Sequence, residues 1–167
     1  MSKQAQKEGN ADLVRLWEDH IRHEFETRST DDTLDTMVED AYVDHVPVLT
    51  GGSGKAELRE FYATHFIPRM PPDMEMVPIS RTIGRDQLVD EMVIKFTHSV
   101  EMDWMLPGIP PTGLRLEVPL VVIVRFQGGK FAHERKSDVS PGPSTSSSTD
   151  LSFVPSPGAS ATRRYFR

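Results

Sequence analysis

The side chains of this chain that could transfer protons are carboxylates and imidazoles, because the sequence has no cysteine. Either group can act as a general acid or base where burial and neighbouring charges move its pKa toward neutrality. Glu91 stands between Val89 and Val93 in a β-rich stretch, and Asp103 precedes Trp104 at the end of that stretch. We expect Glu91 to face a pocket and Asp103 to lie at its rim. The alternatives are a solvent-facing strand residue and an acid in a turn.

Two histidines are further candidates for proton transfer. His45 follows Asp44 in a short predicted strand, and His133 precedes Glu134 in the last one. Successive strand residues face opposite sides, so only one member of each pair can enter a pocket. A lone histidine in such a place is more often a hydrogen-bonded structural residue than a catalyst. If His133 and Glu91 met across the sheet, the pair could shuttle a proton beside a carbonyl group.

Large apolar side chains supply the candidates for binding a flat, apolar ligand. Two of them, Trp104 and Met105, stand beside a loop rich in proline and glycine, where a pocket mouth is expected. Three others fit an ordinary aromatic core equally well: Trp17, Tyr62 and Phe66.

Other kinds of site have weaker support. His20, His23 and Glu24 have the three- and four-residue spacing that can bind a metal on one helix face, but a polar helix flank explains them better, and we predict no metal site. The glycine run before Lys55 lacks the spacing of a phosphate-binding loop, and no Gly-x-Ser-x-Gly sequence indicates a serine hydrolase.

These residues need a fold that brings them together, and the hydrophobic periodicity predicts one. Three helices are expected in the N-terminal part, over 11–28, from Ser29 or Thr30 onward, and up to Phe66. Strands are expected over 41–50, 74–83, 87–104, 114–126 and 131–135. We predict an α+β fold in which three N-terminal helices wrap a curved antiparallel sheet, forming a cone with an internal pocket.

Composition limits the organisation and the partners. The 167 residues suffice for one domain, and a net charge of −6 argues against a nucleic-acid partner. We expect a cytoplasmic protein without a membrane segment, since no apolar run is long enough to span a bilayer and no apolar signal core begins the chain. The predicted division is a flexible 1–10, a cone domain at 11–135, and a disordered Ser/Pro-rich tail at 136–167 that leaves the last strand unfinished.

Several segments, in order, resemble the SnoaL-like polyketide-cyclase branch of the nuclear-transport-factor-two-like superfamily. The resemblance covers roughly residues 11–135, and the segments are Asp44–Pro47, Gly54–Tyr62, Val89–Met92, Glu101–Trp104 and Gly129–Glu134. Family members usually continue after the His-Glu pair with an apolar strand, whereas Lys136 and the residues after it are polar here.

The resemblance implies a cone-shaped pocket, no obligatory metal or organic cofactor, a small apolar or aromatic ligand, and a homodimer packed through the sheet. It leaves three functions open, because one fold hosts many activities. The first is a cofactor-independent cyclase or isomerase that uses general acid/base catalysis in an apolar pocket. The second is a non-catalytic small-molecule-binding or dimerisation module. The third is an incomplete isoform with little activity.

Overall fold

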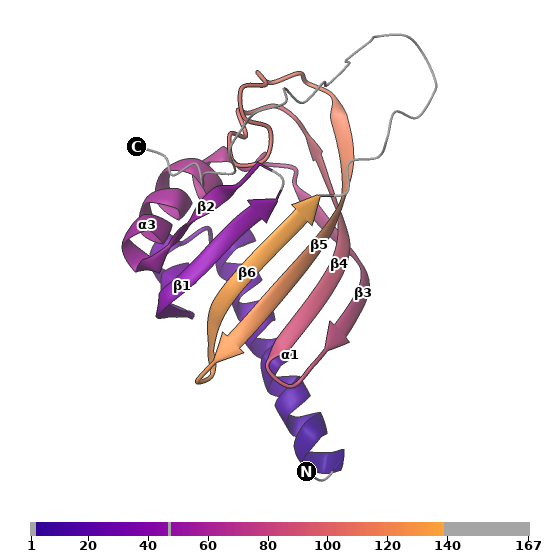
Figure 1. Cartoon of the computed structure of the whole chain (residues 1–167). Coiled ribbons are helices and arrows are strands. Elements are labelled where there is room, and N and C mark those ends of the chain that lie inside the picture. Colours follow the sequence, from indigo (N-terminus) through magenta and orange to yellow (C-terminus); the bar gives the residue numbers. More distant parts are fainter. Residues whose placement is uncertain (1–2, 47, 139–167) are drawn as a thin grey trace, which may run out of the picture.

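A curved, six-stranded sheet holds the helices against one of its faces (Figure 1). This arrangement is that of a computed structural model, which describes residues 3–46 and 48–138. The strands are β1 (Met37–Val46), β2 (Thr50–Ser53), β3 (Glu75–Ile83), β4 (Gln87–Thr97), β5 (Arg115–Gln127) and β6 (Lys130–Asp138). They lie side by side in the order β2-β1-β6-β5-β4-β3.

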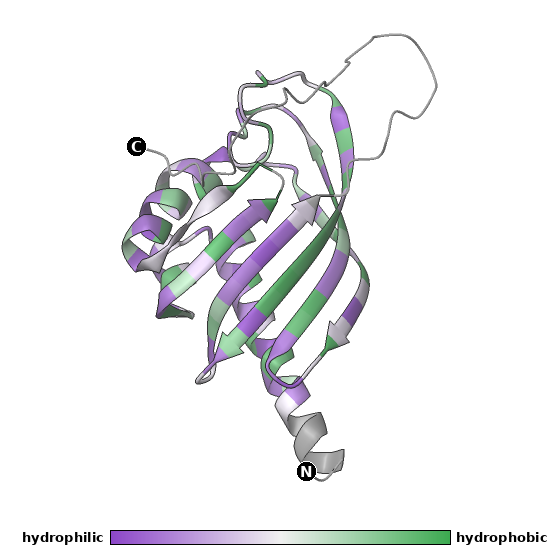
Figure 2. Ribbon diagram, viewed as in Figure 1, coloured by the Kyte–Doolittle hydropathy of each residue, from purple (hydrophilic) through white to green (hydrophobic). Residues whose placement is uncertain are grey.

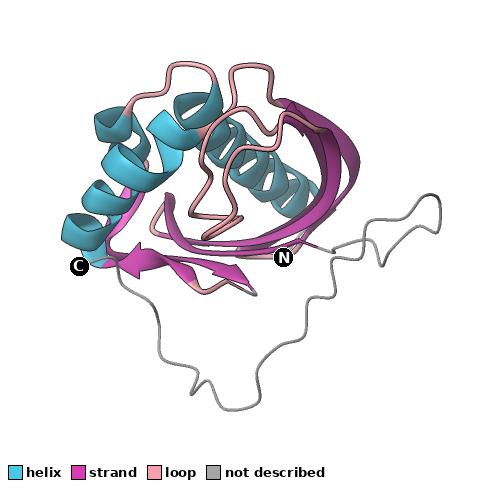
Figure 3. Ribbon diagram, turned by 90° about the horizontal axis from the view of Figure 1, so that it is seen from above, coloured by secondary structure: helices cyan, strands magenta, loops and turns pink. Residues whose placement is uncertain are grey.

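The helices precede most of the sheet, as predicted. They are α1 (Lys3–Phe25), α2 (Thr30–Asp35), α3 (Gly54–Glu60), the π-helix η1 (Phe61–Phe66) and the short 3-10 helix η2 (Ile67–Arg69). Ser29 caps α2 by accepting a hydrogen bond from the Asp32 amide, and it is one of the two caps predicted from the sequence. Seen from above, the sheet bends around the helices, so the predicted α+β cone is confirmed (Figure 3).

Alternation along the central strands produces the two faces of the sheet. Even-numbered residues of β4 are buried and odd-numbered ones are more exposed, and β5 alternates in the same sense along its second half. Figure 2 shows a long continuous hydrophobic stretch in β5, whereas hydrophilic bands interrupt β4. Their inner side chains pack against α1 and the aromatic residues of η1 to form the core.

The end of the sheet differs from the sequence-based expectation in one central respect. The last strand does not stop at Arg135: β6 continues to Asp138, pairing in parallel with β1 (Val46 with Ser137) and antiparallel with β5 (Leu120 with Asp138). Paired on both sides, β6 is a central strand, so the unfinished edge expected after Arg135 is not found in the described residues. The rest of the predicted tail, 139–167, lies outside the described residues.

Three smaller corrections follow. Helix α1 already begins at Lys3, so a helix occupies most of the segment expected to be flexible. The β1–β6 pair is parallel, whereas the other four pairs are antiparallel as expected. Strand β4 ends at Thr97, and the predicted continuation to residue 104 is a loop. None of the helices within the described ranges has the combined length and apolar character needed to cross a bilayer.

The continuation of β6 can be tested at Ser137. Proline there removes a ladder N–H from a central strand, so Ser137→Pro is expected to lower the free energy of unfolding by about 3 kcal/mol. Ser137→Thr keeps the N–H and suits a strand, so it should stay within about 0.5 kcal/mol of the wild type. Urea denaturation followed by circular dichroism measures both. Equal stability of the proline and threonine variants would mean that the strand ends before Ser137.

Candidate active site

A small apolar cavity lies between α1 and the inner face of the sheet. Its volume is about 20 Å³, which is room for about one water molecule. The interior is therefore much more filled than the open pocket expected from the sequence. Its lining is almost wholly apolar, with three methionines, and Glu24 and Lys136 are the two ionisable residues in it. The aromatic and methionine residues of the lining are Trp17, Phe25, Phe66, Met74, Met76, Met92 and Trp104.

The Lys136 ammonium is the positively charged group in the lining of this cavity. Its Nζ lies 2.8 Å from Oε1 of Glu134, two residues earlier on β6, and 3.7 Å from Oε2 of Glu24 on α1. Both carboxylate side chains are fully buried, and the Lys136 side chain is 6% exposed. Nζ also lies 4.6 Å from the centroid of the Phe66 ring, within the range of a cation–π interaction. We call Glu24, Glu134 and Lys136 the buried ion cluster.

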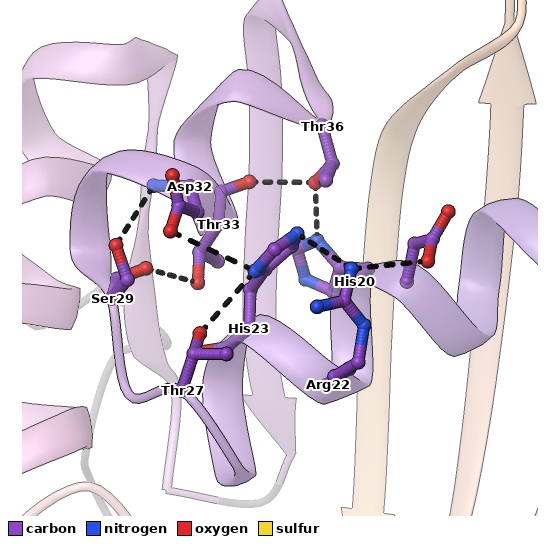
Figure 4. A network of polar contacts seen from close by, with 9 residues as sticks. His20, Arg22, His23, Thr27, Ser29, Asp32, Thr33 and Thr36 are labelled. Atoms are coloured by element: carbon purple, nitrogen blue, oxygen red, sulfur yellow. Dashed lines mark hydrogen bonds and ion pairs between the residues drawn. The ribbon is translucent and has the colours of Figure 1, made fainter.

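His20 connects the buried ion cluster to the end of α2. Its Nε2 lies 3.2 Å from Oε1 of Glu24. Its Nδ1 lies 2.6 Å from Oγ1 of Thr36 (Figure 4). The Thr36 hydroxyl in turn donates to the Thr33 carbonyl, so this network fixes the imidazole from both sides. His23 takes no part, because it contacts Thr27 and Asp32 at the surface instead.

The buried charges change one another's protonation. Burial alone would raise the pKa of the Glu24 carboxyl, but the positive charge of Lys136 and the contact with His20 reverse this and lower that pKa to about 2. Burial lowers the pKa of Lys136, and the charge of Glu24 opposes the shift. Burial, and then the negative charge of Glu24, raise the pKa of the Tyr62 phenol well above its usual value, so Tyr62 remains a neutral group.

A second, smaller cavity shares Trp104, Leu120 and Lys136 with the first and is also lined by His45. The His45 ring is buried among the rings of Phe61, Phe66 and Trp104. Burial, and next the charge of Lys136, keep the pKa of His45 well below its ordinary value, so its imidazole is neutral at physiological pH. Within the described residues, neither its ring nitrogens nor Nε1 of Trp104 has a hydrogen-bond partner.

Three side chains of this interior, those of His20, Glu24 and Glu134, have the ligand types and spacing of a possible metal site. One ligand atom each from His20, Glu24 and Glu134 lie within 4.8 Å of one another. The Lys136 ammonium, however, already lies against both carboxylates and supplies a positive charge from the chain itself. We therefore assign no metal ion or cofactor to these side chains.

Two of the four predicted catalytic residues, Glu91 and His133, do not line this cavity. Glu91 is exposed and accepts a hydrogen bond from Ser80 at 2.9 Å. His133 stacks on Tyr42 with ring centroids 4.2 Å apart and borders a shallow hollow of about 180 Å³ on the outer side of the sheet. The strand register aligns Glu91 with Val121 and Ser137 but His133 with Arg125, so the predicted pair does not meet.

Asp103 and the predicted ligand-binding residues lie in the loop between β4 and β5, in the helices and around the two cavities. Asp103 lies in the loop between β4 and β5, where its Oδ2 is 2.7 Å from Nδ1 of His65. That loop is anchored by a 2.6 Å hydrogen bond from the Thr50 hydroxyl to the Trp104 carbonyl. Trp17, Phe66 and Trp104 line the main cavity and Met105 the second, whereas Tyr62 lines neither.

The sequence contains patterns that indicate the buried ionisable residues missing from our predictions. Asp90 interrupts the apolar even-numbered face of β4, and its carboxylate accepts hydrogen bonds from Trp17 Nε1 at 2.8 Å and twice from Arg81. His20 and Glu24 follow Trp17 by three and seven residues, which places them on the same helix face. Glu134 and Lys136 share the even-numbered, inner side of β6, opposite to His133.

Comparison with known proteins agrees with this architecture. The model of the SnoaL-like domain family matches residues 17–134, so the chain belongs to the SnoaL-like family. Its fold is that of nuclear-transport-factor-two-like proteins. No curated protein matches.

Solved structures resemble the chain in fold at low sequence identity. A protein assigned as a SnoaL-like polyketide cyclase from Jannaschia sp. CCS1 is 20% identical with a TM-score of 0.57, over 75% of this chain and 86% of that one. One assigned as a polyketide cyclase from Xanthomonas campestris pv. campestris is 15% identical with a TM-score of 0.59, over 77% and 91%. A hypothetical protein from Catenulispora acidiphila with a ketosteroid isomerase-like fold, in complex with trimethylamine, is 12% identical with a TM-score of 0.54, over 72% and 82%.

The adjacent acids Asp90 and Glu91 allow a matched test of which face of β4 is buried. Asp90→Ala removes the acceptor shared by Trp17 and Arg81, so we expect a loss of about 3 kcal/mol in the free energy of unfolding. Glu91→Ala removes an exposed contact to Ser80 and should change it by less than about 0.5 kcal/mol. Urea denaturation of the two variants in parallel measures the difference. A larger loss for Glu91→Ala would contradict the assignment of the inner face.

Proposed function

We propose that this chain is a cofactor-independent enzyme of the cyclase or isomerase kind, acting by general acid/base catalysis on an apolar or aromatic carbonyl compound. The observation that carries the proposal is the pair Glu24 and Lys136, held 3.7 Å apart where both line one apolar cavity. A proton acceptor and a cation so placed are what enolisation of a carbonyl compound needs.

The roles follow from charge and position. The Glu24 carboxylate, which the charge of Lys136 and the contact with His20 keep ionised, accepts the proton from the carbon beside the carbonyl group. The Lys136 ammonium stabilises the negative charge that develops on the carbonyl oxygen. In the apolar surroundings this interaction is stronger than it would be in water. His20 holds Glu24 in place and acts as a positioning residue.

His45 is the member of the predicted catalytic set that still fits an interior role. As a neutral imidazole with no hydrogen-bond partner among the described residues, it can donate from one nitrogen and accept at the other. Trp104, which lines both cavities, offers an N–H donor beside it. We assign these two residues to orienting the polar end of the ligand, in a site whose remaining surface is apolar.

Entry of a ligand requires the interior to open, because the cavity has room for about one water molecule. The flexible side chains of Met74, Met76 and Met92 form one part of its wall and can repack around a flat ligand. The loop that carries Trp104 closes another part. The two low-identity neighbours assigned as polyketide cyclases agree with an aromatic polyketide-like substrate.

The catalytic proposal is tested by deuterium exchange. In heavy water, the wild type should incorporate deuterium beside the carbonyl group of α-tetralone, as followed by proton NMR. Glu24→Gln should slow protein-dependent exchange by at least about 100-fold, since it removes the base. It leaves the Lys136–Glu134 contact in place. The outer-face variant Glu91→Gln should exchange at the wild-type rate. No exchange by the wild type, or exchange in Glu24→Gln at the wild-type rate, would overturn the proposal.

A second candidate function, a dimerisation module, is supported by the outer face of the sheet. Ile123 is 39% exposed there and lines the same hollow as Tyr42, Arg125 and His133. We propose that a second copy of this chain covers this surface.

Light scattering coupled to gel filtration tests this proposal. The wild type should elute as a dimer, and Ile123→Asp, which places a charge at the centre of the face, should be monomeric with its fold intact. The matched variant Ile109→Asp, at an exposed position in the loop between β4 and β5, should remain dimeric. A monomeric wild type would refute the proposal.

A further inference from the structure

Lys136 combines three properties of a nucleophilic amine. It is buried, it lines both interior cavities, and it is bracketed by carboxylates that can take up a proton. We propose that Lys136 attacks the carbonyl carbon of an apolar aldehyde or ketone in this cavity and forms an imine with it. This inference rests on the proposed function, because it uses the same cavity and the same class of ligand.

The surroundings of Lys136 favour loss of its proton when a ligand excludes water. Burial lowers the pKa of the amine, and the charge of Glu24 opposes that shift. A lysine in an apolar environment is activated as a nucleophile in this way. The titratable side chains packed around it come from four elements: His20 and Glu24 of α1, His45 of β1, Tyr62 of η1, and Glu134 of β6.

The proposed step balances without an added oxidant or reductant. The Lys136 ammonium gives one proton to Glu134, and the free amine forms a C–N bond to the carbonyl carbon. Through Glu24, a proton moves from the nitrogen to the former carbonyl oxygen, which gives a neutral carbinolamine. Glu134 then returns its proton to that oxygen, the C–O bond breaks, and one water molecule leaves. The product is a protonated imine, which keeps the single positive charge of the original ammonium.

Two neighbouring groups support this chemistry by geometry. Glu134 Oε1 is 2.8 Å from Nζ, a distance suited to direct proton transfer. Trp104 lines both cavities that Lys136 lines, and its N–H has no hydrogen-bond partner among the described residues. It can donate a hydrogen bond to the oxygen as the carbinolamine forms.

The test is reductive trapping of the full chain. The protein is incubated near neutral pH with benzaldehyde and sodium cyanoborohydride, whose hydride reduces an imine to a stable secondary amine. Peptide mass spectrometry then locates the added benzyl group. We expect Lys136 to be labelled at least tenfold faster than the exposed Lys130, which begins the same strand and provides an internal control. Labelling of Lys136 should saturate with benzaldehyde and be slowed by α-tetralone.

Two variants make the result specific. Lys136→Arg keeps the positive charge but cannot form an imine, so the fast-labelled peptide should disappear. Lys130→Arg should leave labelling of Lys136 unchanged. Labelling of Lys136 no faster than that of Lys130, in wild-type protein that is folded by circular dichroism, would overturn the proposal.

The outcome is also separable from that of the acid/base proposal. Deuterium exchange into α-tetralone without trapping at Lys136 would refute the imine and leave Glu24 and Lys136 as an acid/base pair. Trapping at Lys136 without such exchange would support the nucleophile and refute enolisation of the ketone.

Discussion

The interior of this protein depends on the neutralisation of charge inside an apolar cone. Glu24 and Glu134 are fully buried, and each would carry a large desolvation cost without the Lys136 ammonium beside it. His20 adds a further contact to Glu24, so the cluster joins α1, β6 and, through Thr36, the end of α2. Removing Lys136 would leave two buried carboxylates without a cation beside them, so this ammonium holds the cluster together at the centre of the candidate site.

The register of β6 decides which side chains form that cluster. Its parallel pairing with β1 and antiparallel pairing with β5 fix the strand from both sides, and Glu134 and Lys136 then point inward. A slip by one residue would bring His133 and Arg135 inside instead. The strand that carries the site is therefore among the most constrained strands of the sheet, and the ionisable groups are held with little freedom. Such positioning is what acid/base chemistry needs.

Much of the fold follows from local sequence patterns. The site depends instead on which face of each strand the odd- and even-numbered residues occupy, and on pairing between strands that are distant in the sequence. Period-two alternation predicted β4 and β5, and the Ser29 cap predicted α2. The same alternation places Asp90 on the buried face of β4 and Glu91 on the exposed face. A polar residue on an otherwise apolar face is the better candidate for a buried acid, so the pattern favours Asp90. The sequence Lys136-Ser137-Asp138 has little strand propensity. These residues form a strand because they pair with β1 and β5, and no local sequence pattern predicts that pairing.

Stability alone does not account for the polar interior. Replacing a buried ion cluster with apolar side chains of similar volume is often neutral or stabilising, so such a cluster adds little to folding. His45 and Trp104 also leave nitrogen atoms without partners in the described structure, at a cost of about 1–3 kcal/mol for each unsatisfied group. Trp104 lines both cavities that Lys136 lines, and His45 lines the second. A polar ligand atom that supplied the missing hydrogen bonds would remove that cost on binding. Ligand binding therefore explains the unpaired nitrogen atoms, whereas packing does not.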